Sequence, residues 1–163
     1  MGRIHRRLAV GLFALGTASL ALLARPPAAY ADFGSRFAKV GDWVLYKRSD
    51  AAANEPHCIG LYKDRAQVQL TPDALAFYFG PLGVQAYVLR WGNAPATPAI
   101  QASDAEKQAG VVLLKTERFS KEIFTAQWMY LDVLTRLKTI VELEVDLSTT
   151  RLAVDAMTKA CPP

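Results

Sequence analysis

The stretch EPHCIG, residues 55–60, holds the residue types best able to do chemistry, because His57 stands beside Cys58. A cysteine with a histidine can be a nucleophile with its base, the pair can belong to a metal site, or the cysteine can be one end of a disulfide. The 163-residue chain has one further cysteine, Cys161, and one further histidine near its N-terminus. The compartment decides between these chemistries, because disulfides persist in oxidising surroundings and are rare in the cytosol.

The N-terminal segment has the pattern of a secretory signal peptide. Three arginines precede an uncharged, mostly apolar stretch at 8–24, and an A-x-A cleavage site ends at Ala31. A membrane anchor that is never cut is the alternative, but the apolar stretch is short for a span and is diluted by glycine, serine and threonine. The residues around the arginine pair fit a twin-arginine signal poorly, which favours ordinary Sec export. We therefore expect residues 1–31 to be a cleavable signal and residues 32–163 to form one mature domain in the periplasm or outside the cell.

Cleavage would change the charge of the protein. The whole chain has 19 Lys and Arg against 15 Asp and Glu, but four of the basic residues and none of the acidic ones precede Asp32. The mature chain would thus carry 15 basic and 15 acidic groups. A nucleic-acid partner is not expected, because phosphate contacts need a basic stripe and the surplus of basic residues lies in the targeting segment.

In an exported chain, the two cysteines predict a disulfide between Cys58 and Cys161. Such a bridge closes a loop of about 100 residues, which stabilises the fold by up to about 4.7 kcal/mol in the chain-entropy model. A Cys–His catalytic pair is less favoured, because neighbours along a strand point to opposite faces and His57 would point away from Cys58. A zinc site would need carboxylates to complete three or four ligands. We expect no metal and no cofactor, and free or intermolecular thiols are the remaining alternative.

Strands dominate the pattern along the chain. Alternating or β-rich runs predict strands at 42–48, 57–63, 66–72, 110–117 and 139–147. The Ala- and Pro-rich segment 91–110 predicts a long surface loop. The run after it fits both periods, and we expect strand or loop up to Trp128 and a short helix from Tyr130 to Leu137.

Two aromatic runs flank the sequence Gly80-Pro81-Leu82-Gly83, and this turn chemistry predicts a β-hairpin. Alternation places Leu75, Phe77 and Phe79 on one face, so Tyr78 lies on the other. The preferred interpretation is a doubly covered core strand. If one face is open, it is an aromatic contact surface, and its candidate binding residues are Tyr78, Tyr87 and Trp91.

The C-terminal run predicts a helix with Ser148 as its N-cap. Its expected buried face comprises Leu152, Ala153, Ala156, Met157, Ala160 and Cys161. On the preceding strand Glu142, Glu144 and Asp146 are expected to point outward. Same-side residues in a strand are about 6.5–7 Å apart, so we interpret these acids as a solvated face and not as a calcium or catalytic cluster.

The chain resembles the invasion-associated locus B family of small periplasmic or secreted bacterial proteins. The resemblance rests on the signal segment, GDWVLY with Trp43, Cys58, the run LTRLKTIVELEVDLS, and TTRLAVDAMTKAC ending at Cys161. Family members tend to carry a cysteine close after the early tryptophan, where this chain reads VLYKRSD. The resemblance implies an exported, mainly β domain without established catalytic residues.

The fold class expected is mainly β (α+β), an antiparallel β-sandwich or curved sheet with one or two short helices, one of them C-terminal. The expected function is an exported, non-enzymatic binding or accessory protein of the bacterial envelope or secretome. Its partner would be a protein or an envelope component, without stable membrane insertion after signal removal. The alternatives are a small carboxylate-dependent hydrolase and a structural envelope protein with no ligand. The sequence contains no nucleophile-elbow, zincin or P-loop motif, so it indicates no other class of enzyme.

Overall fold

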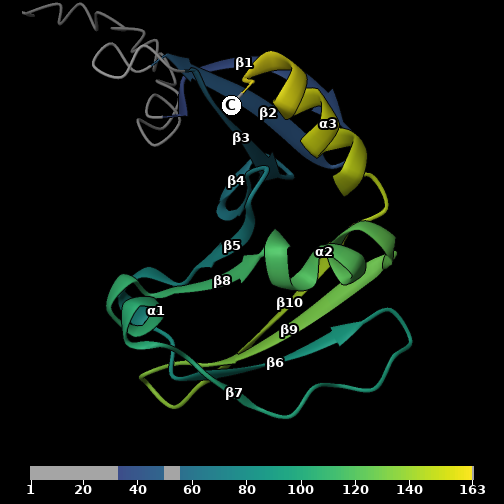
Figure 1. Cartoon of the computed structure of the whole chain (residues 1–163). Coiled ribbons are helices and arrows are strands. Elements are labelled where there is room, and N and C mark those ends of the chain that lie inside the picture. The colour runs from purple at the N-terminus through teal and green to yellow at the C-terminus, as the bar shows by residue number, and fades with distance from the viewer. Residues whose placement is uncertain (1–32, 50–55, 163) are drawn as a thin grey trace, which may run out of the picture.

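A computed structural model describes residues 33–49 and 56–162 (Figure 1). The predicted signal peptide and its cleavage site at Ala31 lie outside these residues. The described chain forms ten strands, three α-helices and a short 3-10 helix, η2. The strands are β1 (Ser35–Val40), β2 (Trp43–Ser49), β3 (Pro56–Tyr62), β4 (Arg65–Leu70), β5 (Ala74–Tyr78), β6 (Ala86–Trp91), β7 (Ile100–Gln101), β8 (Val111–Lys115), β9 (Trp128–Leu134) and β10 (Ile140–Asp146). The helices are η2 (Gly80–Leu82), α1 (Asp104–Ala109), α2 (Thr116–Thr125) and α3 (Thr150–Ala160).

The strands form two antiparallel sheets, which confirms the mainly β fold class. Sheet A has six strands in the order β1-β2-β3-β4-β5-β8, and sheet B has four in the order β10-β9-β6-β7. Phe77 and Leu114 of sheet A and Leu89 and Leu131 of sheet B are fully buried in one shared core. The described residues hold three α-helices where the sequence predicted one or two, and the C-terminal helix is among them.

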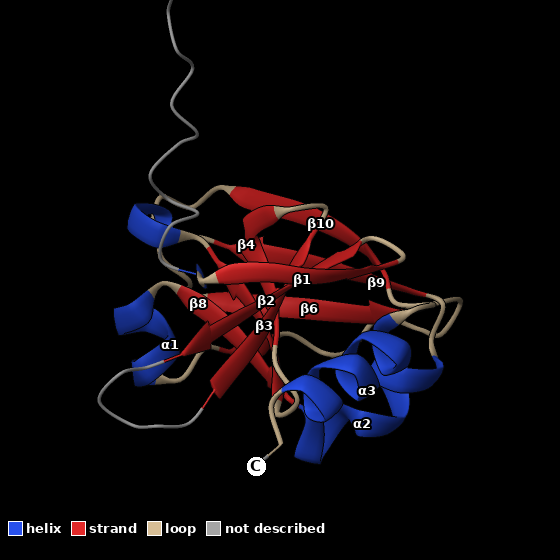
Figure 2. Cartoon of the chain, turned by 90° about the horizontal axis from the view of Figure 1, so that it is seen from above, coloured by secondary structure: helices blue, strands red, loops and turns tan. Residues whose placement is uncertain are grey.

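The two halves of sheet A pack against different elements. Its strands β1, β2 and β3 carry α3, while β4, β5 and β8 lie toward sheet B (Figure 1). Seen from the second direction, α2 and α3 lie side by side at one end of the sandwich (Figure 2). Leu45 on one face of β2 belongs to the main core, whereas Val44 and Tyr46 on the other face form a smaller cluster with Leu61.

The predicted hairpin around Gly80-Pro81-Leu82-Gly83 is wrong, because β5 and β6 lie in different sheets. Strand β5 pairs with β4 and β8, whereas β6 pairs with β9 and β7. The turn sequence instead forms η2, with positive φ at Gly80 and Gly83. Flanking backbone groups bond to distant strands: the Phe79 N–H donates to Gly110 O and the Gln85 N–H to Leu134 O, each at 2.8 Å. Turn chemistry is local, and these long-range pairings override it.

Between Thr116 and Leu134 the structure reverses the predicted order of strand and helix. Helix α2 comes first and β9 follows it, so the predicted helix from Tyr130 to Leu137 is wrong. The alternating residues Met129, Leu131 and Val133 of β9 are fully buried. Trp128 and Tyr130 satisfied both the helical and the alternating pattern in the sequence, and pairing of β9 with strands on both sides makes alternation the relevant one.

The predicted surface loop at 91–110 contains two elements. Strand β7 extends sheet B, and α1 follows with a capping box in which the Ser103 side chain accepts from the Glu106 N–H and the Glu106 carboxylate accepts from the Ser103 N–H. This Ser-x-x-Glu spacing marks the start of a helix. The loop prediction missed it because it relied on the Ala- and Pro-rich composition of the segment.

The C-terminal helix exists, but its predicted start and part of its predicted face are wrong. Ser148 is not the N-cap: its N–H donates to Asp146 Oδ1 at 2.8 Å in a turn, and α3 begins after Thr149. Leu152 is 60% exposed. The buried face runs through Thr150, Ala153, Met157 and Cys161, whose spacing of three and four residues places Leu152 off that face.

Candidate binding surface on the four-stranded sheet

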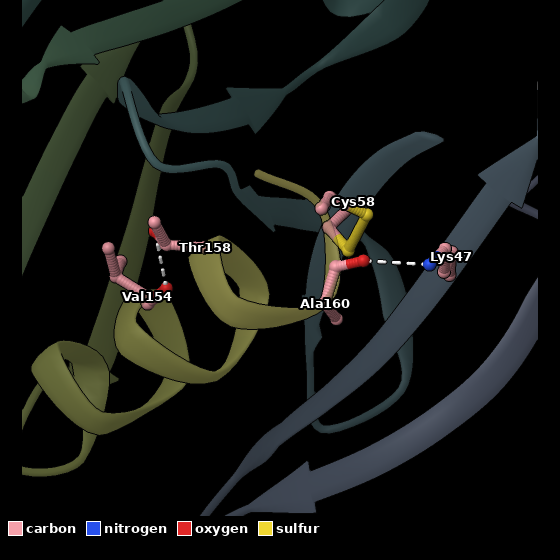
Figure 3. Close-up of a disulfide and its surroundings, with 6 residues drawn as sticks. Lys47, Cys58, Val154, Thr158 and Ala160 are labelled. Carbon is pink, nitrogen blue, oxygen red and sulfur yellow. Dashed lines mark hydrogen bonds between the residues drawn. A yellow bond between two sulfur atoms is a disulfide. The ribbon is translucent and has the colours of Figure 1, made fainter. Parts of the chain in front are cut away.

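The cysteine of EPHCIG has a structural role, because it forms a disulfide. Cys58 and Cys161 form a disulfide with a Cα–Cα distance of 5.9 Å (Figure 3). Cys58 is buried, while His57 is exposed and sits opposite Arg48 of β2. The Lys47 ammonium donates to Ala160 O at 2.7 Å beside the bridge (Figure 3). Bridge and hydrogen bond together tie the end of α3 to β2 and β3.

The predicted aromatic binding residues do not share a surface. Tyr78 is 43% exposed on sheet A, on the face opposite the buried Phe77, as alternation predicted. Tyr87 is buried, which removes it from any contact surface, and Trp91 is half-buried with its ring centroid 6.0 Å from that of Phe119. Because the predicted hairpin does not form, its two strands present these residues in different sheets. A contact role for Tyr78 stays a prediction.

A polar surface lies on the side of sheet B that faces away from the core, here called the outer face of sheet B. Strand registers arrange it as three cross-strand rows. The rows are Glu144–Tyr130–Arg90, Glu142–Asp132–Val88 and Ile140–Leu134–Ala86. The first two rows line a hollow of about 550 Å³ together with Leu143 and, from the loop after β6, Ala96.

Acidic groups dominate the charge of this hollow. Asp132 and Glu142 are exposed and stand directly opposite each other on neighbouring strands, an arrangement in which like charges repel. Glu144 lies in the next row. Among the described residues, Arg90 is the only cation that lines the hollow, and its guanidinium lies 3.8 Å from the ring centroid of Tyr130. A cation–π contact of this kind holds Arg90 over the ring without removing its charge. Three carboxylates against one guanidinium leave the hollow with a net negative charge.

The charge of this surface is complementary to a positively charged group, such as a lysine or arginine side chain. The carboxylates supply acceptors for charge-assisted hydrogen bonds, and Tyr130 holds Arg90 beside them. Within the described residues, no group of three or more His, Cys, Asp or Glu side chains is placed to hold a metal ion. No helix in the described ranges is long and apolar enough to cross a membrane.

Sequence reasoning found one side of this surface and missed the other. The outward direction of Glu142 and Glu144 is confirmed, because both are exposed, while Asp146 is half-buried. Tyr130 and Asp132 were missed because a helix was expected there. The available signal was the alternation of Met129, Leu131 and Val133 with Tyr130 and Asp132, which places the polar residues on the opposite face.

No family model, curated protein or solved structure matches this chain. The chemistry of the outer face of sheet B is therefore what bears on function.

Proposed function

We propose that the protein is an exported, non-enzymatic binding or accessory protein and that its contact surface is the outer face of sheet B. The observation that carries this proposal is the hollow lined by Asp132, Glu142, Glu144 and Tyr130, with Arg90 stacked on the tyrosine. The partner is a protein or envelope component that presents cationic groups. The resemblance to the invasion-associated locus B family supports the same class of function.

Charge complementarity gives this surface its selectivity. Each exposed ion pair contributes about 0–1 kcal/mol, so several contacts are needed for a stable complex. A cationic partner also relieves the repulsion between Asp132 and Glu142, which acts only in the free protein. Binding should weaken as ionic strength rises, because the Debye length falls from about 10 Å at 0.1 M salt to about 3 Å at 1 M.

The disulfide supports export, because such bridges persist in oxidising compartments. Intact mass spectrometry of the protein from its native compartment tests the proposal. We expect a chain that begins at Asp32 and contains no free thiol. A species that retains residues 1–31 would overturn the cleavage, and two alkylatable thiols would overturn the oxidising location.

The binding surface is tested by replacing its charges. The triple variant Asp132→Asn, Glu142→Gln, Glu144→Gln removes the acidic groups while keeping side-chain size. A matched control, Asp73→Asn, Glu117→Gln, Asp155→Asn, removes three exposed acids located elsewhere. Proteins captured from the native compartment by the wild type and by the control, but not by the first variant, would support the proposal. Equal capture by all three would refute this surface.

One observation favours the carboxylate-dependent hydrolase as a second candidate. Asp132 stands directly opposite Glu142, and hydrolysis by carboxylates needs two acids held a few ångströms apart. Assays on glycoside substrates with the wild type and with Asp132→Asn decide between the candidates. Turnover by the wild type that Asp132→Asn abolishes would replace binding with catalysis as the function.

A further inference from the structure

Strand β10 ends sheet B on one side, and its backbone directions are fixed by bonds at both ends. The Leu147 N–H donates to Gln127 O, and the Thr135 N–H donates to Thr139 O, so the odd-numbered residues turn their backbone groups toward β9. The even-numbered residues must turn theirs away from the sheet. In agreement, the Asp146 N–H donates to the Tyr62 hydroxyl at 2.9 Å and not to β9.

Three consecutive edge positions of β10 offer unpaired backbone groups. Ile140, Glu142 and Glu144 each turn an N–H and a C=O outward, and these groups pair with no described residue. All three residues are exposed, Ile140 by 67%. Tyr62 closes the far end at Asp146. A row of free donors and acceptors along an edge is a template for another extended chain.

The core is also incompletely covered along this edge. Val141 and Leu143 point inward but remain half-buried, whereas Val145 beside Tyr62 is 1% exposed. A further strand placed against β10 would lay every second side chain over Val141 and Leu143. The other side chains of that strand would stand beside Glu142 and Glu144 on the outer face of sheet B.

We propose that an extended segment of a partner protein adds to sheet B as a fifth strand along β10. The segment carries Lys or Arg on the side next to Glu142 and Glu144 and apolar residues on the side over Val141 and Leu143. Main-chain hydrogen bonds supply affinity in this mode, and alternate side chains supply specificity. The proposal rests on the proposed function, because it assigns a chemistry and a geometry to the partner.

Charge argues for a partner segment over a second copy of β10. Two copies of β10 paired across an edge would bring glutamates against glutamates, and like charges opposite each other destabilise a sheet. The edge strand β1 of sheet A carries Arg36 and Lys39, both exposed, beside Val44 and Tyr46. A basic segment is repelled there, so charge favours β10 over β1 as the edge that it joins.

The first test uses a fluorophore-labelled peptide of alternating lysine and valine, measured by fluorescence anisotropy. Two further peptides carry N-methyl groups, one on all lysine amides and one on all valine amides. In an added strand, only one of these two sets of N–H groups faces β10. We expect one methylated peptide to bind at least about tenfold more weakly, because it loses several hydrogen bonds, and the other to bind like the parent.

Variants of the protein complete the test. Glu142→Pro removes an outward N–H without removing a bond to β9, and Glu142→Gln is the matched control that removes the charge alone. We expect Glu142→Pro to bind the peptide at least about fivefold more weakly than Glu142→Gln, with circular dichroism confirming that both variants are folded.

Four outcomes would overturn strand addition. They are no binding of the parent peptide, equal binding of both methylated peptides, equal binding by Glu142→Pro and Glu142→Gln, and wild-type chains that self-associate through β10 in sedimentation experiments. The first three leave the proposed function standing if the acid-free triple variant still loses its captured partners. Loss of strand addition and loss of the binding surface are therefore distinguishable.

Discussion

Breaking the bridge between Cys58 and Cys161 should remove a large part of the stability of the fold. The change is made in three ways: Cys58→Ser, Cys161→Ser and both together. Each releases the C-terminal end of α3 from β3, where the bridge now holds it. Reduction of the wild-type protein makes the same cut without changing the sequence.

The magnitude follows from the length of chain that the bridge closes. Its ends are 103 residues apart, and a loop of about 100 residues corresponds to about 4.7 kcal/mol in the chain-entropy model. Residual structure in the unfolded chain lowers this, so we expect a loss of about 2–4 kcal/mol. The helix does not detach in the folded state, because Ala153 and Met157 are fully buried and the Trp43 indole N–H donates to Thr150 Oγ1 at 3.2 Å.

Urea denaturation followed by circular dichroism measures this loss. Oxidised wild type is compared with reduced wild type and with the three variants, all variants being kept reduced to prevent dimers. For a domain of this size each kcal/mol lowers the melting temperature by about 3–5 °C, so a fall of roughly 10 °C is expected.

The double variant provides the internal control. Either single change breaks the same bond, so the double variant should lose no more than a single one. Two results would refute the reasoning: equal stability of the oxidised and reduced protein within about 0.5 kcal/mol, or single losses that add in the double variant.

Three further predictions concern the core and the alkaline limb of stability. Thr150→Val should cost about 1–3 kcal/mol in chemical denaturation, since it leaves the buried Trp43 N–H without an acceptor, while Thr150→Ser should cost less. Met157→Ala should cost about 2–5 kcal/mol and Leu152→Ala less than about 0.5, and the reverse order would contradict the observed face of α3. Burial, aided by the negative charge of Glu106, raises the pKa of Tyr87 above its usual value near 10, so the unfolded chain loses this proton first and stability should fall as pH rises from about 10. Tyr87→Phe should flatten that fall when unfolding is measured between about pH 9 and 11, and an unchanged slope would exclude Tyr87 as its cause.

Strands that bury one face against the core could be predicted from the alternation of apolar and polar residues. Strands β2, β3, β4, β8 and β10 lie where alternation or β-rich runs predicted them, because each must bury one set of side chains against the core. The disulfide was predictable from the two cysteines together with the predicted export signal. The hairpin failed because Gly80-Pro81-Leu82-Gly83 specifies a turn but not the sheet that the chain enters next. That choice depends on pairing with β9, more than 40 residues further along the chain.

The candidate binding surface was only partly predictable. Glu142 and Glu144 could be placed on an outer face from their own strand. Their meeting with Tyr130, Asp132 and Arg90 depends on the registers of β10 with β9 and of β9 with β6, which no local pattern specifies. The exposure of Leu152 was missed for a related reason: a local helical pattern does not specify which side of α3 packs on β1, β2 and β3, and the buried face follows Thr150, Ala153 and Met157.

The packing of α3 on the first strands has a consequence for how the chain folds while it is being synthesised. A chain that is made from its N-terminus presents β2 and β3 long before α3, the helix that covers them. At about 5–20 residues per second, the 103 residues from Cys58 to Cys161 take roughly 5–20 s to appear. During that interval Trp43, Leu45 and the Cys58 thiol lack their final cover. The Cys58 thiolate can then attack a foreign disulfide, forming a mixed disulfide and releasing the other sulfur as a thiolate, and the early sheet can pair with another nascent chain. A chaperone that masks the sheet for seconds would therefore raise the yield of folded protein more than one that acts on the finished chain.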